Sequence, residues 1–597
     1  MKIHDQQAIS PGYWFVAPYA SLRQKDFKKW NGPHIYDGNG ELVWSGAPMF
    51  KHYNMYDFRL AKVDGEDKMT VIFEDKATGM ILDSNYEISQ SVDMLGQVLP
   101  QWLLDQIDGS RGTNMHDFNL IADGKRVLML TKVWENATRE ESAAVGFDGE
   151  CTAKWQGFKE VDVATSEVLF EWNAHGHIDL EESTFEKKGG LQKMCNGNAG
   201  PGGWDILHLN SIDKFPDGDY LLSSRHTDAV YKISHLDGSI VWRLGGTQSD
   251  FEFDEDGLFS RQHHARVYSQ NETHTVVSVF DNALGTGPHE HSTSDQSRGL
   301  LLSLHTDTKP MKVETLANFD RPDGRYTSAR GSVQFMGNGN AFVCWAKGSF
   351  ISEHTSDGKL IMQAELKLDK ANTYRGYKYP WVGRPAHPPD VHAAAIDMGS
   401  NMTSTLIHVS WNGATEVTAW KLYRTNADGK SDELIASTSR QGFETSLSYP
   451  GFATFVVLEA IDAKGEVLGR SDLVKTIPPA NQVGPSEALE AQWLQEHSVA
   501  EATSASGVLE ALENPLVALV LSGVSCGVTI CAVIFLWLAT RNGRLWKSFR
   551  PSKYERVGDE NEDGDVEDET LVQEDYHEEK VLKKSVVWAD DTDDSGA

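Results

Sequence analysis

The sequence has few cysteines and a large deficit of positive charge. Only 5 of its 597 residues are cysteine, and none has the C-x-x-C spacing of a structural zinc site. Asp and Glu outnumber Lys and Arg by 87 to 55, which gives a formal net charge of −32. A nucleic-acid interface needs clustered Lys and Arg to neutralise phosphates, so we expect no nucleic-acid partner.

Long amphipathic helical patterns are also scarce in the first 395 residues. In their place, a turn rich in Asp, Gly, Ser or Thr precedes a short apolar strand four times, at 36–46, 161–174, 233–246 and 354–366. A chain of this length is expected to hold more than one module, because single cores rarely grow beyond about 250–300 residues. Repeated antiparallel strands predict an all-β fold, with a β-propeller over residues 1–397.

The pattern changes after residue 397. Residues 398–478 predict about seven short strands around a buried tryptophan, similar to a fibronectin type III sandwich. An Ala-, Glu- and Ser-rich stalk at 479–514 follows, and residues 515–540 carry no charge, long enough for a transmembrane helix. The tail at 541–597 is basic and then acidic, and its composition predicts disorder.

The charges beside the uncharged segment predict its orientation. Arg541, Arg544 and Lys547 follow it, whereas the preceding stalk is acidic, so the positive-inside rule places the tail in the cytosol and the body in the lumen or outside the cell. The first 18 residues do not have the apolar core of a secretory signal, so either a preceding segment is missing or the orientation is reversed. A basic cytosolic partner, not identified by the sequence, would suit the acidic tail.

Two kinds of modification would fit a luminal body. Asn136, Asn271 and Asn401 are candidate N-glycosylation sites, although about three such sequons are expected by chance. Cys151 and Cys195 either form a disulfide in an oxidising compartment or remain buried thiols, and the sequence leaves both open.

Four polar clusters interrupt the apolar strands of the propeller region. They are "NMHDF" with His116, "WDILHLNSI" with His208 and Asn210, "LLSSRHT" with Arg225 and His226, and "RQHHAR" with His263 and His264. Residues two apart share a face of a strand, so His208 and Asn210 are expected to point the same way, and His263 to lie opposite His264. Inner strands of a propeller converge on one funnel, where such clusters can meet.

The chain resembles the arylsulfotransferase family, in particular its fungal branch, in a collinear set of motifs over roughly residues 10–395. Besides the clusters above, the set includes "SPGYWFVAPY", "FKEVDVATSEVLFEW", "GSIVWRLGG", "FDNA" and "GSVQFMGNGN". The resemblance implies a six-bladed propeller that transfers a sulfuryl group between phenols through a sulfohistidine, without an adenylyl-sulfate donor.

The family motifs also imply residue roles. The nucleophile of the Q-H-x-A motif corresponds to His263, the H-x-N motif to His208 and Asn210, the S-x-R motif to Arg225, and the D-x-H-E-F motif to His116. Asn114 and Asp117 depart from the last motif, where the family carries Asp and Glu, so the surroundings of His116 are expected to differ.

These residue types suit sulfuryl transfer. A neutral imidazole is a competent nucleophile near neutral pH, and fixed cations stabilise charge on the equatorial oxygens of the sulfuryl group. The departing phenolate needs a proton donor, for which His116 and His208 are the candidates, and we expect His264 to contact substrate. We expect aryl sulfates and phenols as substrates, and no metal or other cofactor.

Two other functions are compatible with the sequence. A propeller with a sandwich, a stalk and one span also describes a receptor or adhesion protein that binds without catalysis. A metal-dependent hydrolase or lyase using His263, His264, His289 and His291 is a further alternative, although the "PHEHS" segment is more typical of a solvated loop.

Overall fold

The computed structural model describes most of the first 479 residues. The described ranges are 1–20, 29–73, 78–93, 116–185, 190–196, 203–271, 274–285, 292–368, 371–400, 402–429 and 432–479. Within them the chain is all-β, with only short helices such as α2 (Arg139–Ala144) and α3 (Gly190–Cys195). The predicted stalk, span and tail lie outside these residues, and so does Asn114.

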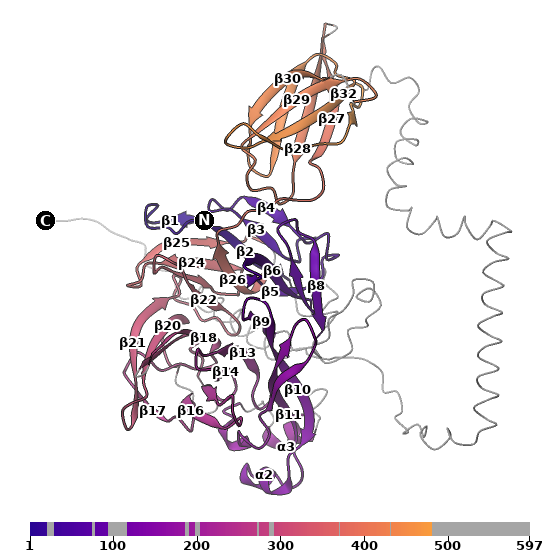
Figure 1. The fold of residues 1–597 in the computed structure, drawn as a ribbon. Helices are drawn as coiled ribbons and strands as arrows, with labels where there is room; N and C mark the ends of the chain where they lie inside the picture. The colour runs from indigo at the N-terminus through magenta and orange to yellow at the C-terminus, as the bar shows by residue number, and fades with distance from the viewer. Residues whose placement is uncertain are drawn as a thin grey trace, which may run out of the picture.

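Six separate sheets account for the strands between residues 2 and 379 in the described ranges (Figure 1). Five contain a run of four strands consecutive in the sequence, and two of these five have a further edge strand. The runs are β5 (Met55–Val63), β6 (Glu66–Phe73), β7 (Thr78–Leu82), β8 (Ile88–Asp93); β9 (Phe118–Ile121), β10 (Arg126–Asn136), β11 (Thr152–Asp162), β12 (Val168–Asn173); β13 (Leu209–Lys214), β14 (Tyr220–Ser224), β15 (Ala229–Ile233), β16 (Ile240–Gly245); β18 (His263–Gln270), β19 (His274–Asp281), β20 (Arg298–His305), β21 (Met311–Asp320); and β22 (Ser332–Phe335), β23 (Ala341–Cys344), β24 (Phe350–His354), β25 (Leu360–Glu365). A parallel edge strand, β17 (Phe251–Phe253), joins β21.

The sixth sheet joins the two ends of this region. Its strand β26 (Asn372–Tyr379) pairs with β2 (Tyr13–Tyr19), which is followed by β3 (His34–Tyr36) and β4 (Leu42–Ser45). In addition, β1 (Lys2–Ile3) pairs with β25 of the preceding sheet. Both ends of the 2–379 region are therefore held by ladder hydrogen bonds.

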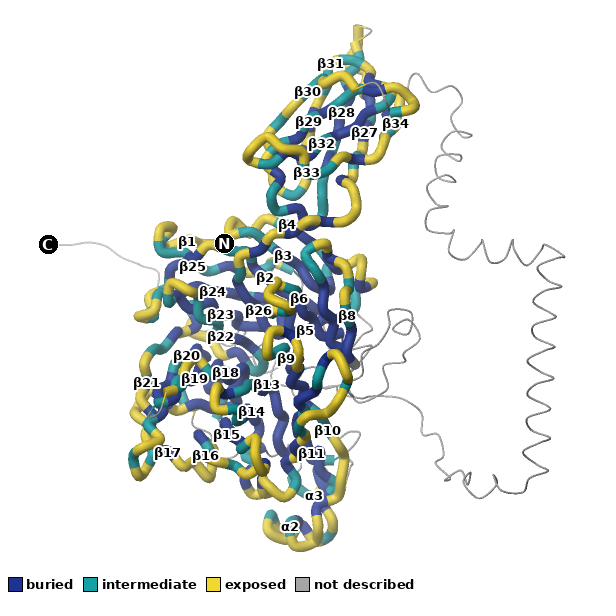
Figure 2. Tube along the Cα trace, in the orientation of Figure 1, coloured by how far each residue is buried: buried dark blue, intermediate teal, exposed yellow. Residues whose placement is uncertain are grey.

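Each pair of successive sheets shares a hydrophobic core, and the last sheet shares one with the first. Figure 2 shows the buried residues concentrated inside this body. For example, Leu221 and Leu244 of β14 and β16 pack with Val279 and Leu302 of β19 and β20, while Phe342 of β23 packs with Trp14 of β2. The six cores follow the order of the sheets around a closed ring.

The predicted internal repeat is confirmed as a hairpin between the last two strands of a sheet. The four predicted segments correspond to β3–β4, β11–β12, β15–β16 and β24–β25, and β7–β8 is a fifth member. All five have a register shift at the turn and a residue with positive φ at the same position: Gly40, Tyr86, Ser166, Gly238 and Gly358. Glycine reaches this left-handed conformation without steric cost, which explains why it recurs in the repeat.

A second unit of two sheets follows β26. One sheet contains β27 (Asp390–Gly399), β28 (Met402–Ser410) and β31 (Glu444–Pro450); the other contains β29 (Ala419–Thr425), β30 (Glu433–Ser439), β32 (Phe455–Ile461), β33 (Val467–Arg470) and β34 (Val474–Lys475). They share a core that includes a buried tryptophan, Trp420. The boundary predicted at 397/398 falls inside β27, because this strand already pairs with β28 from Asp390 onward.

Direct contacts join the two units. The Tyr86 hydroxyl donates to the carbonyl of Gly413, and the Gly413 amide donates to the carbonyl of Val43. The second unit is therefore held against the β3–β4 end of the first, as Figure 1 also shows.

The predicted modification sites have varied outcomes. Cys151 and Cys195 are joined by a disulfide across 44 residues. Asn136 and Asn271 are exposed at the ends of β10 and β18, whereas Asn401 lies outside the described residues. None of the helices within the described parts of residues 1–479 has the length and apolar character of a bilayer-spanning segment.

Candidate functional site

The predicted residues gather at one end of the ring of sheets. His116 lies two residues before β9, His208 immediately precedes β13, and His263 is the first residue of β18. These strands are the first of three successive sheets, and the cores between the sheets place them side by side. Their leading residues therefore meet, although about 150 residues separate the first from the last.

His263 is held in a single orientation. Its Nδ1 lies 2.7 Å from Oδ1 of Asn282 and 3.1 Å from the carbonyl oxygen of Arg261. The Asn282 amide nitrogen donates to the carbonyls of Thr327 and Arg330, so its Oδ1 must face the imidazole. Because both neighbours of Nδ1 are acceptors, Nδ1 carries the proton and Nε2 keeps its lone pair.

The surroundings of His263 also keep the ring neutral. Its side chain is 2% exposed, and burial, followed by the positive charge of Arg225, lowers its pKa well below the usual range of histidine. The Nε2 lone pair accepts a hydrogen bond from the amide of Arg330 at 3.2 Å. An incoming electrophile must displace this bond.

Arg225 is held close to the segment 328–330, which also contacts His263. Its Nη2 donates to the carbonyl of Ser328, and its Nη1 lies 2.9 Å from Nε2 of His226. His226 donates through Nδ1 to the carbonyl of Asp205 at 2.6 Å, so its Nε2 is the acceptor for Arg225. The buried Nε of Arg225 has no hydrogen-bond partner in the described part of the chain.

His116 and His208 form a direct pair. Their Nε2 atoms are 3.2 Å apart, and Nδ1 of His208 lies 2.9 Å from Oδ2 of Asp205. The ammonium of Lys154 lies 3.6 Å from the same carboxylate oxygen. Burial, together with His208 and Lys154, lowers the pKa of His116 well below the usual range of histidine.

Asn210 is placed differently from its predicted partner His208. Its amide nitrogen donates to the carbonyl of Gln262 at 2.8 Å, and its Oδ1 is buried. Because Gln262 precedes the proposed nucleophile, Asn210 supports the chain next to His263. The Gln262 side chain in turn donates to carbonyls at both ends of the β14–β15 turn, those of Ser224 and Ala229.

His264 points into a different cluster from His263. Its Nε2 lies 3.2 Å from the hydroxyl of Tyr377, which donates to Asp57 at 2.7 Å. The simple alternation predicted for β18 does not hold, because φ is positive at Arg261 and His264 and the register shifts between His263 and Arg266. His264 is enclosed in this cluster, and its contact with substrate remains a prediction.

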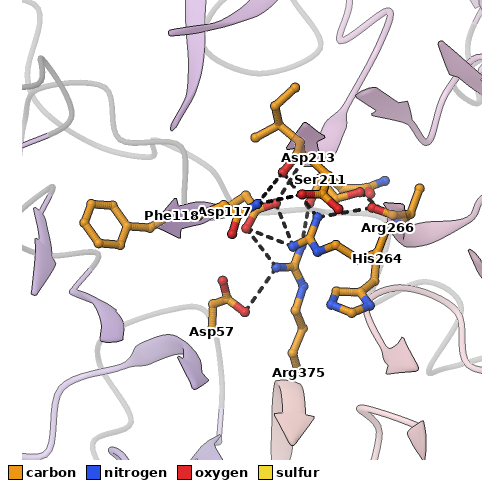
Figure 3. Close-up of polar contacts among 12 residues, drawn as sticks. Asp57, Asp117, Phe118, Ser211, Asp213, His264, Arg266 and Arg375 are labelled. Carbon is orange, nitrogen blue, oxygen red and sulfur yellow. Dashed lines mark hydrogen bonds and ion pairs between the residues drawn. The ribbon is translucent and has the colours of Figure 1, made fainter. Parts of the chain in front are cut away.

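The cluster around His264 is a buried network of arginines and aspartates (Figure 3). Asp117 accepts from Arg266 at 2.9 and 3.1 Å and from Arg375 at 3.1 Å, and Arg375 continues to Asp57. Burial opposes ionisation of Asp117, but Arg266, Arg375 and Arg59 outweigh it and lower the pKa of this carboxyl. Asp117, one of the two residues that depart from the family motif, is thus the centre of a network that joins β5, β9, β18 and β26.

Asp205, His208 and His226 are the one trio of the described residues with metal-ligand geometry. Their candidate ligand atoms lie within 4.8 Å of one another. However, Arg225 is hydrogen-bonded to His226, and Lys154 lies beside Asp205. A cation would have to compete with both, so the trio as it stands suits an anion better. His289 and His291 of the alternative metal site lie outside the described residues.

Sequence reasoning missed three residues of the site and named a fourth, His226, without giving it a role. Asn282 lies in the "FDNA" motif, which carried no role, and His226 follows Arg225 in "SSRHT". Asp205 stands three residues before His208, a spacing that could have suggested their contact. Lys154 carried no signal, because only the pairing of distant strands brings it to Asp205.

Comparisons with known proteins give a family and distant structural likenesses. No curated protein matches the chain. Solved structures that resemble it include a protein of unknown function from Bacteroides caccae, at 13% identity over 62% of this chain and 99% of that chain, with a TM-score of 0.33. Another is virginiamycin B lyase from Staphylococcus aureus with quinupristin, at 9% identity over 60% and 83%, with a TM-score of 0.28.

A protein from Lactobacillus plantarum is 11% identical over 73% of this chain and all of that chain, with a TM-score of 0.28. None of these scores is high enough to compare strands one by one. The family result is more direct, because the arylsulfotransferase (ASST) model matches residues 63–367, about half of the chain and the part that holds His116, His208, Arg225 and His263. The chain belongs to the arylsulfotransferase family.

Proposed function

We propose that this protein moves a sulfuryl group from an aryl sulfate to a phenol through a sulfohistidine at His263, without an adenylyl-sulfate donor. One observation carries the proposal: Nδ1 of His263 is saturated by two acceptors, which leaves Nε2 as a neutral nucleophile. That nitrogen faces the segment 328–330, which also contacts Arg225. A nucleophile and a cation thus border the same space.

The reaction takes two displacements at sulfur. In the first, the Nε2 lone pair forms the N–S bond while the S–O bond to the aryl group breaks, and the bonding pair and a proton leave with the phenol. In the second, the oxygen of an incoming phenol attacks the same sulfur, its proton returns to the site, and the N–S pair returns to Nε2. Each half is a single in-line substitution, which is easier than one direct transfer.

The remaining residues suit stabilisation of the sulfuryl oxygens. Arg225 presents a fixed guanidinium, because His226 and the carbonyl of Ser328 hold two of its nitrogens. Its Nε, which has no hydrogen-bond partner among the described residues, is then available to an oxygen of the sulfuryl group. A donor that is already oriented costs little reorganisation when charge develops in the transition state. This chemistry needs no metal or other cofactor.

The architecture that we propose is a six-bladed propeller followed by a fibronectin type III-like sandwich, as in the fungal-type branch that the motifs resemble. The closed order of six sheets and six shared cores supports the propeller. We further propose a single membrane span at 515–540, with the propeller luminal or extracellular and the acidic tail cytosolic. The uncharged segment and the basic residues after it support this orientation.

The test is sulfuryl transfer from 4-nitrophenyl sulfate to phenol by the full-length protein. We expect turnover and, when the acceptor is omitted, an acid-labile sulfuryl adduct on the peptide that contains His263, detected by mass spectrometry. His263→Ala should abolish both, whereas His235→Ala, at an exposed histidine paired with Asp219, should change neither. Binding of aryl sulfate without an adduct would contradict the proposal and favour a non-catalytic receptor.

A further inference from the structure

The two histidines that could donate a proton differ in their partners. Nδ1 of His208 lies 2.9 Å from the carboxylate of Asp205, and the amide of His208 donates to the other carboxylate oxygen at 3.3 Å. His208 has a positive φ of 50°, an uncommon conformation for a histidine, and Asp205 holds both its backbone and its ring there. His116 contacts His208 through its own Nε2 atom, at 3.2 Å.

We infer that Asp205 is a positioning residue for sulfuryl transfer, which holds His208 so that its Nε2 carries the proton to the departing phenolate and recovers it from the incoming phenol. This inference rests on the proposed function. Asp205 holds Nδ1 of His208 in the protonated state, so the only nitrogen that can exchange a proton is Nε2. That atom points toward His116 and away from Asp205.

The charges around Asp205 support this role. Burial opposes ionisation, but Lys154 and His208 outweigh it, and the pKa of Asp205 lies well below the usual range of aspartic acid. The carboxylate is therefore anionic and accepts the hydrogen bond from Nδ1 of His208. His116, which is neutral because burial lowers its pKa, accepts from Nε2 of His208 until a phenolate oxygen replaces it.

Protons and electrons balance across the cycle. As the S–O bond breaks, its electron pair stays on the phenolic oxygen, which takes the Nε2 proton of doubly protonated His208. His208 is then neutral and retains its Nδ1 proton against Asp205. The incoming phenol returns a proton to Nε2 as its oxygen attacks sulfur, and the N–S pair returns to His263.

Asp205 also aligns the cation of the site. Its backbone carbonyl accepts from Nδ1 of His226, and that contact turns Nε2 of His226 toward Arg225. A side-chain substitution at residue 205 leaves this carbonyl in place. A side-chain variant of Asp205 therefore disturbs His208, which carries the proton, and leaves intact the hydrogen bond from His226 to the carbonyl of residue 205 that orients Arg225.

The experiment compares donors with different leaving groups. Full-length wild type, Asp205→Asn and the control Asp219→Asn are assayed with phenyl sulfate and with 4-nitrophenyl sulfate. The control breaks an equivalent carboxylate–imidazole contact, that of Asp219 with His235 at 2.8 Å, outside the site. Phenolate from phenyl sulfate is the stronger base, with a phenol pKa of about 10, so its departure depends more on a proton donor.

We expect Asp205→Asn to lower kcat by roughly 100-fold with phenyl sulfate and by less than about 10-fold with 4-nitrophenyl sulfate, with little change in KM. Equal losses with both donors would show a structural role, and no loss would show no role; either result overturns the inference. Absence of transfer by the wild type would instead contradict the proposed function.

A second variant keeps the test valid if Asp205→Asn does not fold cooperatively. His208→Gln should show the same steeper dependence on the leaving group. The double variant Asp205→Asn/His208→Gln should be no steeper than His208→Gln alone, because Asp205 acts only through this ring. Additive losses in the double variant, or equal losses with both donors in His208→Gln, would also overturn the inference.

Discussion

Asn282 controls which nitrogen of His263 is available for attack, and its substitution should change the pH dependence of the reaction. In the folded protein, its Oδ1 accepts the Nδ1 proton at 2.7 Å while its amide donates to two carbonyls. Asn282→Ala removes an acceptor worth about 0.5–1.5 kcal/mol, which corresponds to a loss of kcat of roughly 2- to 13-fold. The loss should be similar across the pH range.

Asn282→Asp perturbs the same contact in a different way. A carboxylate at this position would favour doubly protonated His263 by about 1.5–3 kcal/mol, which raises the pKa of His263 by about one to two units. In the wild type, burial and Arg225 keep this pKa low, so activity should persist below pH 6. In Asn282→Asp the acid limb of the profile of kcat against pH should therefore move to higher pH, since only the neutral His263 ring attacks sulfur.

The assay is kcat against pH from about 4 to 9 with 4-nitrophenyl sulfate, whose departure depends least on a proton donor. Asn340→Ala is the matched control, because Asn340 is buried and bonded to the carbonyl of Ala8 and to Glu353, in a different sheet. It should leave the acid limb unchanged. If Asn282→Asp also leaves the limb unchanged, Asn282 does not set the protonation of His263 and the reasoning fails.

Three further outcomes follow from the structure. Arg225→Lys should lower kcat for aryl sulfates, and Arg225→Met should raise KM; the fold-loss of kcat in the first variant should be at least as large as the fold-increase of KM in the second. The reason is that an ammonium cannot match the three-nitrogen geometry of the guanidinium, and equal kinetics of wild type and Arg225→Lys would contradict it. Asp117→Asn should lower the free energy of unfolding by about 3–5 kcal/mol in urea, because it removes the buried negative charge that Arg59, Arg266 and Arg375 share, whereas exposed Asp237→Asn should cost less than about 0.5 kcal/mol. Reduction of the Cys151–Cys195 disulfide should cost about 3–4 kcal/mol by loop entropy; Cys151→Ser should melt at the temperature of the reduced protein, and Cys344→Ala should still respond to reductant.

The local elements of the fold could be predicted because their signals are local. Each repeated hairpin has an Asp-, Ser- or Thr-rich turn, a left-handed residue at one position and a short apolar strand, and all three features lie within about a dozen residues. The fifth hairpin, β7–β8, was missed; Tyr86 occupies the left-handed position that glycine holds in three of the other hairpins and Ser166 in the fourth. The boundary within β27 was missed because only its pairing with β28 assigns Asp390 to the second unit.

The residues of the candidate site also fall into two groups, those that short motifs identified and those that only tertiary contacts reveal. Motifs identified His116, His208, Arg225 and His263, because each stands in a short recognisable segment. They did not identify Asn282 or Lys154, whose partners lie 19 residues away in the first case and 51 residues away in the second. Alternation predicted that His264 would lie opposite His263, but it could not identify the partner of His264, Tyr377, which lies 113 residues further along the chain.

The sequence alone determined the strand-rich class, the repeated hairpins and the residue types for sulfuryl chemistry, since these depend on composition and on neighbours along the chain. The tertiary structure decided which nitrogen of His263 is free, which histidine has a carboxylate behind it, and that Asp117 anchors three arginines. The physical reason is that hydrogen-bond partners and burial are set by the packing of separate sheets. Both come from segments far apart in the chain, and together they determine where each proton resides.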